Sequence, residues 1–322
     1  MYYFGIDLGG TNISAGLVDE NYKIILKKSC KTNVPRSEAE VCDDMAGLFF
    51  EVISEAGVNS NEIPFVGIGS PGAVNRKSGV VEFANNLFFH NWDLQKMMEN
   101  RLNKKVFIEN DANVAAFGEF IAGAAKNTKS SITITIGTGI GSGIILDGEI
   151  YNGINYSAAE LGHMVIVPNG RPCSCGRHGC FEQYASANGL ILTTKKYLEN
   201  ISKNDSIIWS LIENNINNIN AKSAFTAMKL GDVLGQKIVK EYCEYLSLGI
   251  VNIVNIFQPE IICIGGGVCN EGDLLLAPIR KAIKNERYSK YARIQTKLCS
   301  ALLGNEAGII GAAFLAASTY KS

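Results

Sequence analysis

The feature that most constrains this chain is a short run of metal-binding side chains near its middle. Cys173, Cys175 and Cys180 follow His163 closely in the sequence, and two glycines between the thiols allow a tight turn. Three thiols and an imidazole are a donor set that Zn²⁺ prefers in a closed tetrahedral site, with no position left for water. The sequence therefore predicts a structural zinc site that shapes a loop.

Other interpretations of this run stay open from the sequence alone. His178 lies inside the run and is an alternative fourth ligand, and His163 is then an ordinary core histidine. A disulfide with one free thiol is another option, although nothing else in the sequence indicates an oxidising compartment. Glu160 and Glu182 flank the run, so we expect the loop that zinc orders to include both carboxylates.

The composition is that of an ordinary globular protein. The 322 residues are 47% hydrophobic and 19% charged, which suggests two domains with a large core. A net charge of -1 gives no general attraction to nucleic acid or to an anionic membrane. The first residues form an apolar strand without the features of a signal peptide, and no apolar run approaches the ~20 residues that span a bilayer. We expect a cytoplasmic enzyme or binding protein.

Periodicity predicts an α/β chain. Strands are expected at residues 2–8, 13–18, 24–30, 65–69, 106–109, 131–137, 143–147, 261–264 and 292–298, and helices at 38–56, 113–125, 274–283 and 306–317, with a mainly helical stretch from 181 to 257. The first three strands predict an antiparallel meander. A strand, a glycine turn and a second strand occur near residues 4–18 and again near 132–146, which suggests two similar α/β lobes with a cleft between them.

Three glycine-rich segments are candidate phosphate or nucleotide loops, because successive backbone N–H groups can point into one concavity. They comprise Asp7, Gly9, Gly10, Thr11 and Asn12; Gly137, Thr138 and Gly139; and Gly265, Gly266 and Gly267. The second segment joins two strands instead of opening a helix, which argues against both a Rossmann site and a P-loop. Tight β-turns, and for the third segment a strand-to-helix turn, are the alternatives.

Two aspartates are candidates for phosphoryl-transfer chemistry, which needs a carboxylate to take a proton and a cation to hold phosphate charge. Asp111 follows an apolar strand and opens a predicted helix, so it is either a general base or an N-cap. Asp7 is either an Asx-turn residue or a carboxylate that holds Mg²⁺ through water.

In combination these motifs resemble the ROK family of bacterial sugar kinases and related repressors. The segments Asp-Leu-Gly-Gly-Thr at 7–11, Ser-Pro-Gly at 70–72, Glu-Asn-Asp-Ala-Asn at 109–113, Gly-Thr-Gly-Ile-Gly at 137–141, Glu-Leu-Gly-His at 160–163, the cysteine run and the triple glycine at 265–267 occur in the family's order. The resemblance covers essentially the whole chain. It implies a two-lobed actin-like/hexokinase (ribonuclease H-like) ATPase fold, with the zinc loop in the second lobe.

The resemblance also implies residue roles. Asp111 would be the general base, the glycine segments would bind the phosphates and adenosine of Mg-ATP, and the sugar would be bound by Asn86, Asn110, Glu160, His163 and Glu182. The zinc ligands would be His163, Cys173, Cys175 and Cys180, so that the imidazole serves both metal and sugar. Closure of the lobes would exclude water from the reaction.

A sugar-responsive repressor is the rival class, and the start of the first glycine loop at Asp7 favours a kinase because such repressors carry an N-terminal helix-turn-helix. The resemblance implies glucose as the substrate, phosphorylated on its 6-hydroxyl; allose, N-acetylmannosamine, N-acetylglucosamine and fructose stay open. We expect a homodimer. The expected lobes are residues 1–112, completed by a helix at 304–319, and residues 113–303.

Overall fold

The computed structural model describes residues 1–316 and groups them into two compact units. The first unit contains Met1–Thr133, Gly143–Ala159 and the chain from Ala301 onward, and the second contains Ile134–Ser142 and Glu160–Ser300. The lobe boundary at residue 112 that the sequence suggests stays a prediction. No helix within residues 1–316 is both long enough and apolar enough to cross a membrane.

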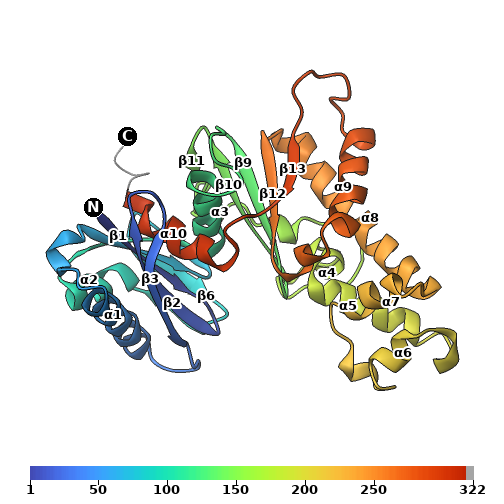
Figure 1. Cartoon of the computed structure of the whole chain (residues 1–322), viewed down its shortest axis with the longest axis horizontal. Coiled ribbons are helices and arrows are strands. Elements are labelled where there is room, and N and C mark those ends of the chain that lie inside the picture. Colours follow the sequence, from blue (N-terminus) through green and yellow to red (C-terminus); the bar gives the residue numbers. More distant parts are fainter. Residues whose placement is uncertain (317–322) are drawn as a thin grey trace. The chain divides into compact units, whose positions relative to one another are not determined.

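The first unit is built on a five-stranded sheet in the order β3-β2-β1-β4-β8, of which β1, β2 and β3 are labelled in Figure 1. Its strands are β1 (Tyr2–Leu8), β2 (Asn12–Asp19), β3 (Ile24–Lys31), β4 (Phe65–Ser70) and β8 (Lys105–Asn110). β1, β2 and β3 form the expected antiparallel meander, and β4 and β8 continue the sheet in parallel to β1. The carboxyl ends of β1, β4 and β8 therefore meet at one edge, where the aspartate-bearing segments begin.

Helices cover both faces of this sheet. Successive side chains of a strand such as β1 point to opposite faces, so each face offers residues for a helix to pack on. On one face Phe4 and Ile6 pack with α1 (Glu38–Glu55) and α2 (Leu94–Leu102), and on the other α3 (Asp111–Ile121) and α10 (Ala307–Ala313) pack together against the strands. Ser37 and Glu40 form a capping box that begins α1. A side chain at Gly5 or Gly67 would overlap the backbone of α10, so both glycines permit its close approach.

A second sheet has the order β11-β10-β9-β12-β13. Its strands are β9 (Ser131–Ile136), β10 (Ile140–Leu146), β11 (Glu149–Ile150), β12 (Ile261–Gly265) and β13 (Lys297–Ser300). The helices that follow it in the second unit are α4 (Glu182–Ala185), α5 (Ala187–Leu198), α6 (Ile208–Leu211), α7 (Ser223–Lys229), α8 (Val233–Phe257) and α9 (Asp273–Glu286). The predicted helical stretch after residue 181 is thus confirmed, and its longest member, α8, packs against α7 and α9.

Short elements complete the fold. A three-stranded sheet contains β5 (Ala73–Asn75), β6 (Val80–Ala84) and β7 (Phe89–Trp92), and 3₁₀ turns lie at η1 (Ser60–Glu62), η2 (Leu161–His163), η3 (Lys203–Asp205), η4 (Ile216–Asn218), η5 (Gly267–Glu271) and η6 (Gly304–Glu306). The small sheet was not predicted. The strand expected at 292–298 is misplaced: it overlaps β13 only at residues 297 and 298, because β13 begins at Lys297 after an exposed turn. The expected terminal helix is α10, and its predicted residues beyond 316 lie outside the described residues.

Candidate functional site

Asp111 is the first residue of α3 and comes directly after β8. The helix is capped by Asn110, whose Oδ1 accepts hydrogen bonds from the backbone N–H groups of Ala112 at 2.9 Å and Asn113 at 3.2 Å. The interpretation of Asp111 as the N-cap is therefore wrong. Its partly exposed carboxylate lies one position later, where it accepts a bond from the Ala112 N–H at 2.8 Å and is stabilised as an anion by the helix dipole.

Asp7 is a second carboxylate at the same edge of the sheet. Burial raises the pKa of Asp7 to about 6, and the nearby charge of Asp111 contributes to the rise. The side chain packs on α10, because a methyl group added to Gly308 would come within 2.6 Å of the Asp7 carboxylate. Two carboxylates that disfavour each other's ionisation form an electrostatic environment that a divalent cation would stabilise.

The first glycine segment is the tight turn between β1 and β2, as the Gly9 N–H donates to the Asn12 carbonyl at 2.9 Å. Asn86, in the connection between β6 and β7, lies over this turn: a side chain at Gly10 would meet the Asn86 Cβ at 3.3 Å. Asn110 is bonded to the turn between β4 and β5, since its Nδ2 donates to the Gly72 carbonyl at 2.9 Å. In the first unit, therefore, Asn86 lies beside the glycine turn, and both the Oδ1 and the Nδ2 atoms of Asn110 are hydrogen-bonded.

The other two glycine segments lie at the ends of β9 and β12 in the second unit. Gly266 has φ +94°, and a side chain there would overlap the Ile136 carbonyl, so packing alone requires glycine. Among the described residues, no atom beyond the adjacent residues in the chain lies within 4 Å of a Cβ added to Gly137 or Gly267, and neither glycine has a positive φ. Packing and backbone conformation therefore leave glycine unexplained at these two positions, which is expected where a backbone approaches a ligand closely.

The structure brings together the four side chains predicted as zinc ligands. The donor atoms of His163, Cys173, Cys175 and Cys180 all lie within 4.8 Å of one another, and His178 does not belong to this cluster. Backbone bonds shape the loop: the Cys173 N–H donates to the Arg177 carbonyl at 2.9 Å, and glycines with positive φ at 176 and 179 make its turns.

The donor chemistry and spacing of this cluster fit Zn²⁺. His163 Nδ1 lies 3.6 Å from Cys173 Sγ, and Cys175 Sγ lies 3.6 Å from Cys180 Sγ. Zn–S bonds of about 2.3 Å place tetrahedral donors roughly 3.7 Å apart, which agrees with both pairs. Zinc here would hold the loop together and, with four protein donors, would leave no open position for catalysis.

Both flanking carboxylates lie beside this cluster, as the sequence suggested. Glu182 Oε1 is 3.1 Å from Cys173 Sγ and 3.8 Å from His163 Nδ1. Its other oxygen borders the second glycine segment, since a Cβ on Gly139 would meet Glu182 Oε2 at 2.6 Å. Glu160 Oε2 lies 4.0 Å from His163 Nε2, the ring nitrogen that faces away from the thiols. The imidazole thus has one nitrogen toward the cluster and one toward a carboxylate.

Sequence reasoning missed Arg171, which holds the zinc loop against the following helices. Its guanidinium donates to the carbonyls of Gln183 at 2.7 Å and Gly189 at 3.1 Å and to Thr193 Oγ1 at 2.9 Å, and it lies over the ring of Tyr184. An arginine in a loop gives no sequence signal of these contacts. These contacts of Arg171 hold the zinc loop, which contains His163 and leads to Glu182, against α4 and α5.

Glu109 is the other missed residue, and it did carry a sequence signal, a charge at the end of an apolar strand. It is buried, with 1% of its surface exposed. Its carboxylate accepts hydrogen bonds from the Asn110 N–H at 2.8 Å, Asn113 Nδ2 at 3.1 Å and Asn152 Nδ2 at 2.7 Å. Burial nevertheless raises its pKa, against the effect of these donors.

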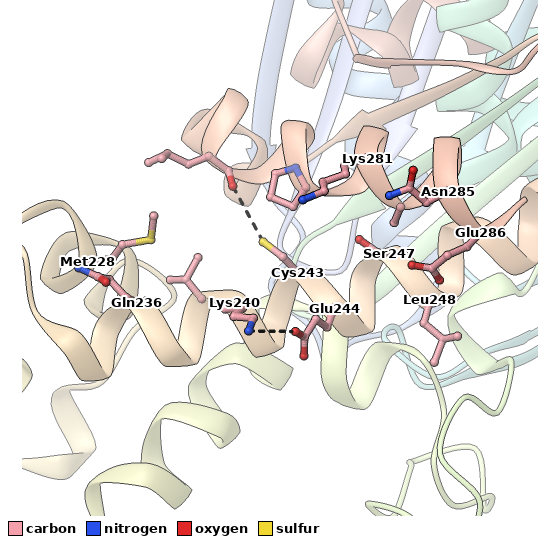
Figure 2. Close-up of a pocket in the computed structure, with 14 residues that line it drawn as sticks. Met228, Gln236, Lys240, Cys243, Glu244, Ser247, Leu248, Lys281, Asn285 and Glu286 are labelled. Atoms are coloured by element: carbon pink, nitrogen blue, oxygen red, sulfur yellow. Dashed lines mark hydrogen bonds and ion pairs between the residues drawn. The ribbon is translucent and has the colours of Figure 1, made fainter.

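A cavity of about 670 Å³ lies between α8 and α9 (Figure 2). Lys240 and Glu244 of α8 form an ion pair at 3.9 Å on its wall, and Lys281 and Asn285 of α9 face it from the other side. None of the residues predicted to bind sugar, phosphate or metal lines this cavity. Volume alone therefore does not identify the candidate site in this chain.

Known proteins are similar to this chain over nearly its whole length. The ROK family model matches residues 3–319. The chain is 36% identical to the glucokinase of Streptomyces coelicolor over 97% of this chain and 96% of that protein, and 31% identical to the xylose repressor of Bacillus spizizenii over 96% of this chain and 75% of that protein. The crystal structure of a ROK family glucokinase from Streptomyces griseus with glucose and AMPPNP matches with a TM-score of 0.81 and 34% identity, covering 98% of this chain and 99% of that one.

Proposed function

The chain belongs to the ROK family, and on this premise we propose that it is an ATP-dependent sugar kinase that phosphorylates a hexose. The observation that carries the proposal is the start of α3, where Asn110 caps the helix and Asp111 lies next to it beside Asp7. Asn110 supplies the side-chain cap, and the Ala112 N–H holds the Asp111 carboxylate at the first position of α3. A general base at this position would take the proton of the attacking sugar hydroxyl.

We assign the remaining roles within each unit. In the first, Asn86 and Asn110 bind sugar hydroxyls, the turn at 9–12 binds phosphate, and Asp7 holds Mg²⁺ through water. In the second, Glu160, His163 and Glu182 bind the sugar, and the segments at 137–139 and 265–267 bind the nucleotide. The glycines at 137 and 267, which packing leaves unexplained, support the nucleotide assignment.

Zinc has a structural role in this proposal. It would hold the loop so that His163 Nε2, which lies toward Glu160, is presented to a sugar hydroxyl while Nδ1 faces the metal. Carboxylates and imidazole together recognise several hydroxyls by accepting from and donating to them. A polar site of this kind rejects analogues that lack a hydroxyl, because its own groups would be left unpaired.

Glucose is the substrate we propose first, with its 6-hydroxyl as acceptor, since the glucokinases of Streptomyces coelicolor and Thermotoga maritima are both 36% identical to this chain. Allose, N-acetylmannosamine, N-acetylglucosamine and fructose are the alternatives. A sugar-sensing regulator without turnover is the second candidate class, favoured by the 31% identity to a xylose repressor. We also propose a homodimer, which light scattering of the purified protein would test.

A coupled ADP-release assay with Mg-ATP across these sugars and mannose tests the function. We expect turnover on one sugar and a loss of about 10² to 10⁴ in kcat in Asp111→Asn, with KM for ATP nearly unchanged. Undiminished turnover in Asp111→Asn would refute the base assignment. Absence of turnover on every sugar, in protein confirmed to contain zinc, would favour the regulator.

A further inference from the structure

The hydrogen bonds of Glu109 join two segments that are far apart in the sequence. One carboxylate oxygen accepts from Asn110 N–H and Asn113 Nδ2, at the beginning of α3. The other accepts from Asn152 Nδ2 at 2.7 Å, in the loop after β11, and lies 3.9 Å from Arg76 Nη1. All of these residues belong to the first unit.

Asn152 is the residue that closes this loop. Its backbone carbonyl accepts from the Ala158 N–H at 3.1 Å, so residues 152–158 form a closed loop anchored at Asn152. The side chain is buried, with 6% exposed, whereas Ile154 at the tip is fully exposed. Glu160, one of the proposed sugar-binding residues, follows directly after Ala159 in the chain.

We propose that Glu109 is a positioning residue for the sugar, because its buried carboxylate fixes the loop that leads into Glu160 to the same helix start that carries Asp111. The inference rests on the proposed function. Glu109 does not touch the reacting atoms in this proposal. It acts through the side chain of Asn152 on one side and through the backbone N–H of Asn110 on the other. Burial of a charge is costly unless it is paired and hydrogen-bonded, and this carboxylate has three donors and a nearby guanidinium.

The hydrogen bond between Asn152 and Glu109 can be tested by exchanging its donor and its acceptor. The other polar atom of the Asn152 side chain, Oδ1, has no hydrogen-bond partner among the described residues. Asn152→Asp places a second carboxylate against Glu109, where two acceptors repel each other. In Glu109→Gln the remaining side-chain oxygen can still accept from Asn110 N–H and Asn113 Nδ2 at the start of α3, and the new NH₂ group can donate to a side chain at position 152. The double variant therefore restores a hydrogen bond of reversed direction, from Gln at 109 to Asp at 152.

We expect Asn152→Asp to raise KM for the sugar about tenfold or more, with KM for ATP within about twofold of wild type, which is the scale of losing a buried hydrogen bond to a charge. Glu109→Gln together with Asn152→Asp should recover most of this loss. Asn155→Asp is the matched control, since it adds the same charge to the exposed part of the same loop and should leave both KM values unchanged.

Hydrogen–deuterium exchange of residues 151–163 gives a readout that does not depend on turnover. Exchange should rise in Asn152→Asp and in Asn152→Ala and return toward wild type in the double variant. No rescue in the double variant, or equal changes in both KM values accompanied by a loss of thermal stability, would overturn the inference. If the wild type phosphorylates no sugar, the proposed function fails, while the exchange experiment still tests whether Glu109 fixes this loop.

Discussion

Replacing Asp7 with asparagine should make the protein more stable at neutral pH and less active. Burial and the nearby Asp111 raise the pKa of Asp7 to about 6, against 3.8 for an unperturbed carboxyl group. The folded protein therefore binds a proton at position 7 more tightly than the unfolded chain does. An ionised Asp7 disfavours folding, and an amide of the same shape carries no charge to be ionised.

The sign and size of the effect follow from these two pKa values. Well below pH 3.8 the carboxyl is protonated in both states and costs nothing; the cost appears as the pH rises through 3.8 toward 6 and is complete above 6. Roughly two pK units at 1.36 kcal/mol each correspond to about 3 kcal/mol at pH 8. At pH 5 the same linkage leaves about 1.6 kcal/mol.

Urea unfolding of wild type and Asp7→Asn, followed by circular dichroism at pH 5 and pH 8, measures this difference directly. We expect the variant to be more stable by about 3 kcal/mol at pH 8, to lose about half of that advantage at pH 5, and to have lost most ATP-dependent turnover. Asp147→Asn, at an exposed turn with φ +52°, is the control and should show no comparable pH dependence. Equal stability of Asp7→Asn and wild type at pH 8 would refute the reasoning.

Two further predictions concern the metal cluster and the packing of α10. Cys175→Ser should abolish zinc binding, measured by mass spectrometry of the metal, and should raise KM for the sugar much more than KM for ATP. Cys30→Ser is the control and should change neither zinc content nor KM. Full zinc content in Cys175→Ser would contradict the ligand assignment. Gly67→Ala should destabilise the protein by about 1 to 3 kcal/mol or more in urea unfolding, because its methyl group would overlap the Ala312 carbonyl. Gly47→Ala, in an open position of α1, should stabilise it by about 0.5 to 1 kcal/mol, and a similar result for both glycines would contradict the packing argument.

The fold class and the metal cluster were predictable because their signals are local. The antiparallel meander is encoded by two apolar strands joined by a tight glycine turn and by a third, alternating strand, and the cluster by four donors in one loop. The hairpins β5 to β7 were missed because strands of three to five residues give little alternation to read. The strand at 292–298 was misplaced because the apolar residues there, including Ile294, are exposed in a turn.

The partners of Glu109 and Arg171 could not be predicted, because each side chain bonds to segments that only folding brings near. Asn152 is 43 residues from Glu109, and Thr193 is 22 residues from Arg171. The sequence shows an acid at the end of an apolar strand and a base in a loop, and nothing in either pattern names the partner. Contacts of this kind depend on tertiary packing, which overrides local preference.

Neighbouring residues with similar local preferences can have different roles, which only the structure distinguishes. Asn110 and Asp111 are both good helix caps, yet one carboxamide takes the cap and the adjacent carboxylate does not, which is what makes a base at 111 chemically reasonable. Within one glycine triplet, Gly266 is fixed by contact with the Ile136 carbonyl, whereas no atom of residues 1–316 beyond its chain neighbours lies within 4 Å of a Cβ added to Gly267. A residue that the fold already explains is weak support for a ligand site. The glycines that packing leaves unexplained, at 137 and 267, therefore carry more of the argument for a nucleotide site than Gly266 does.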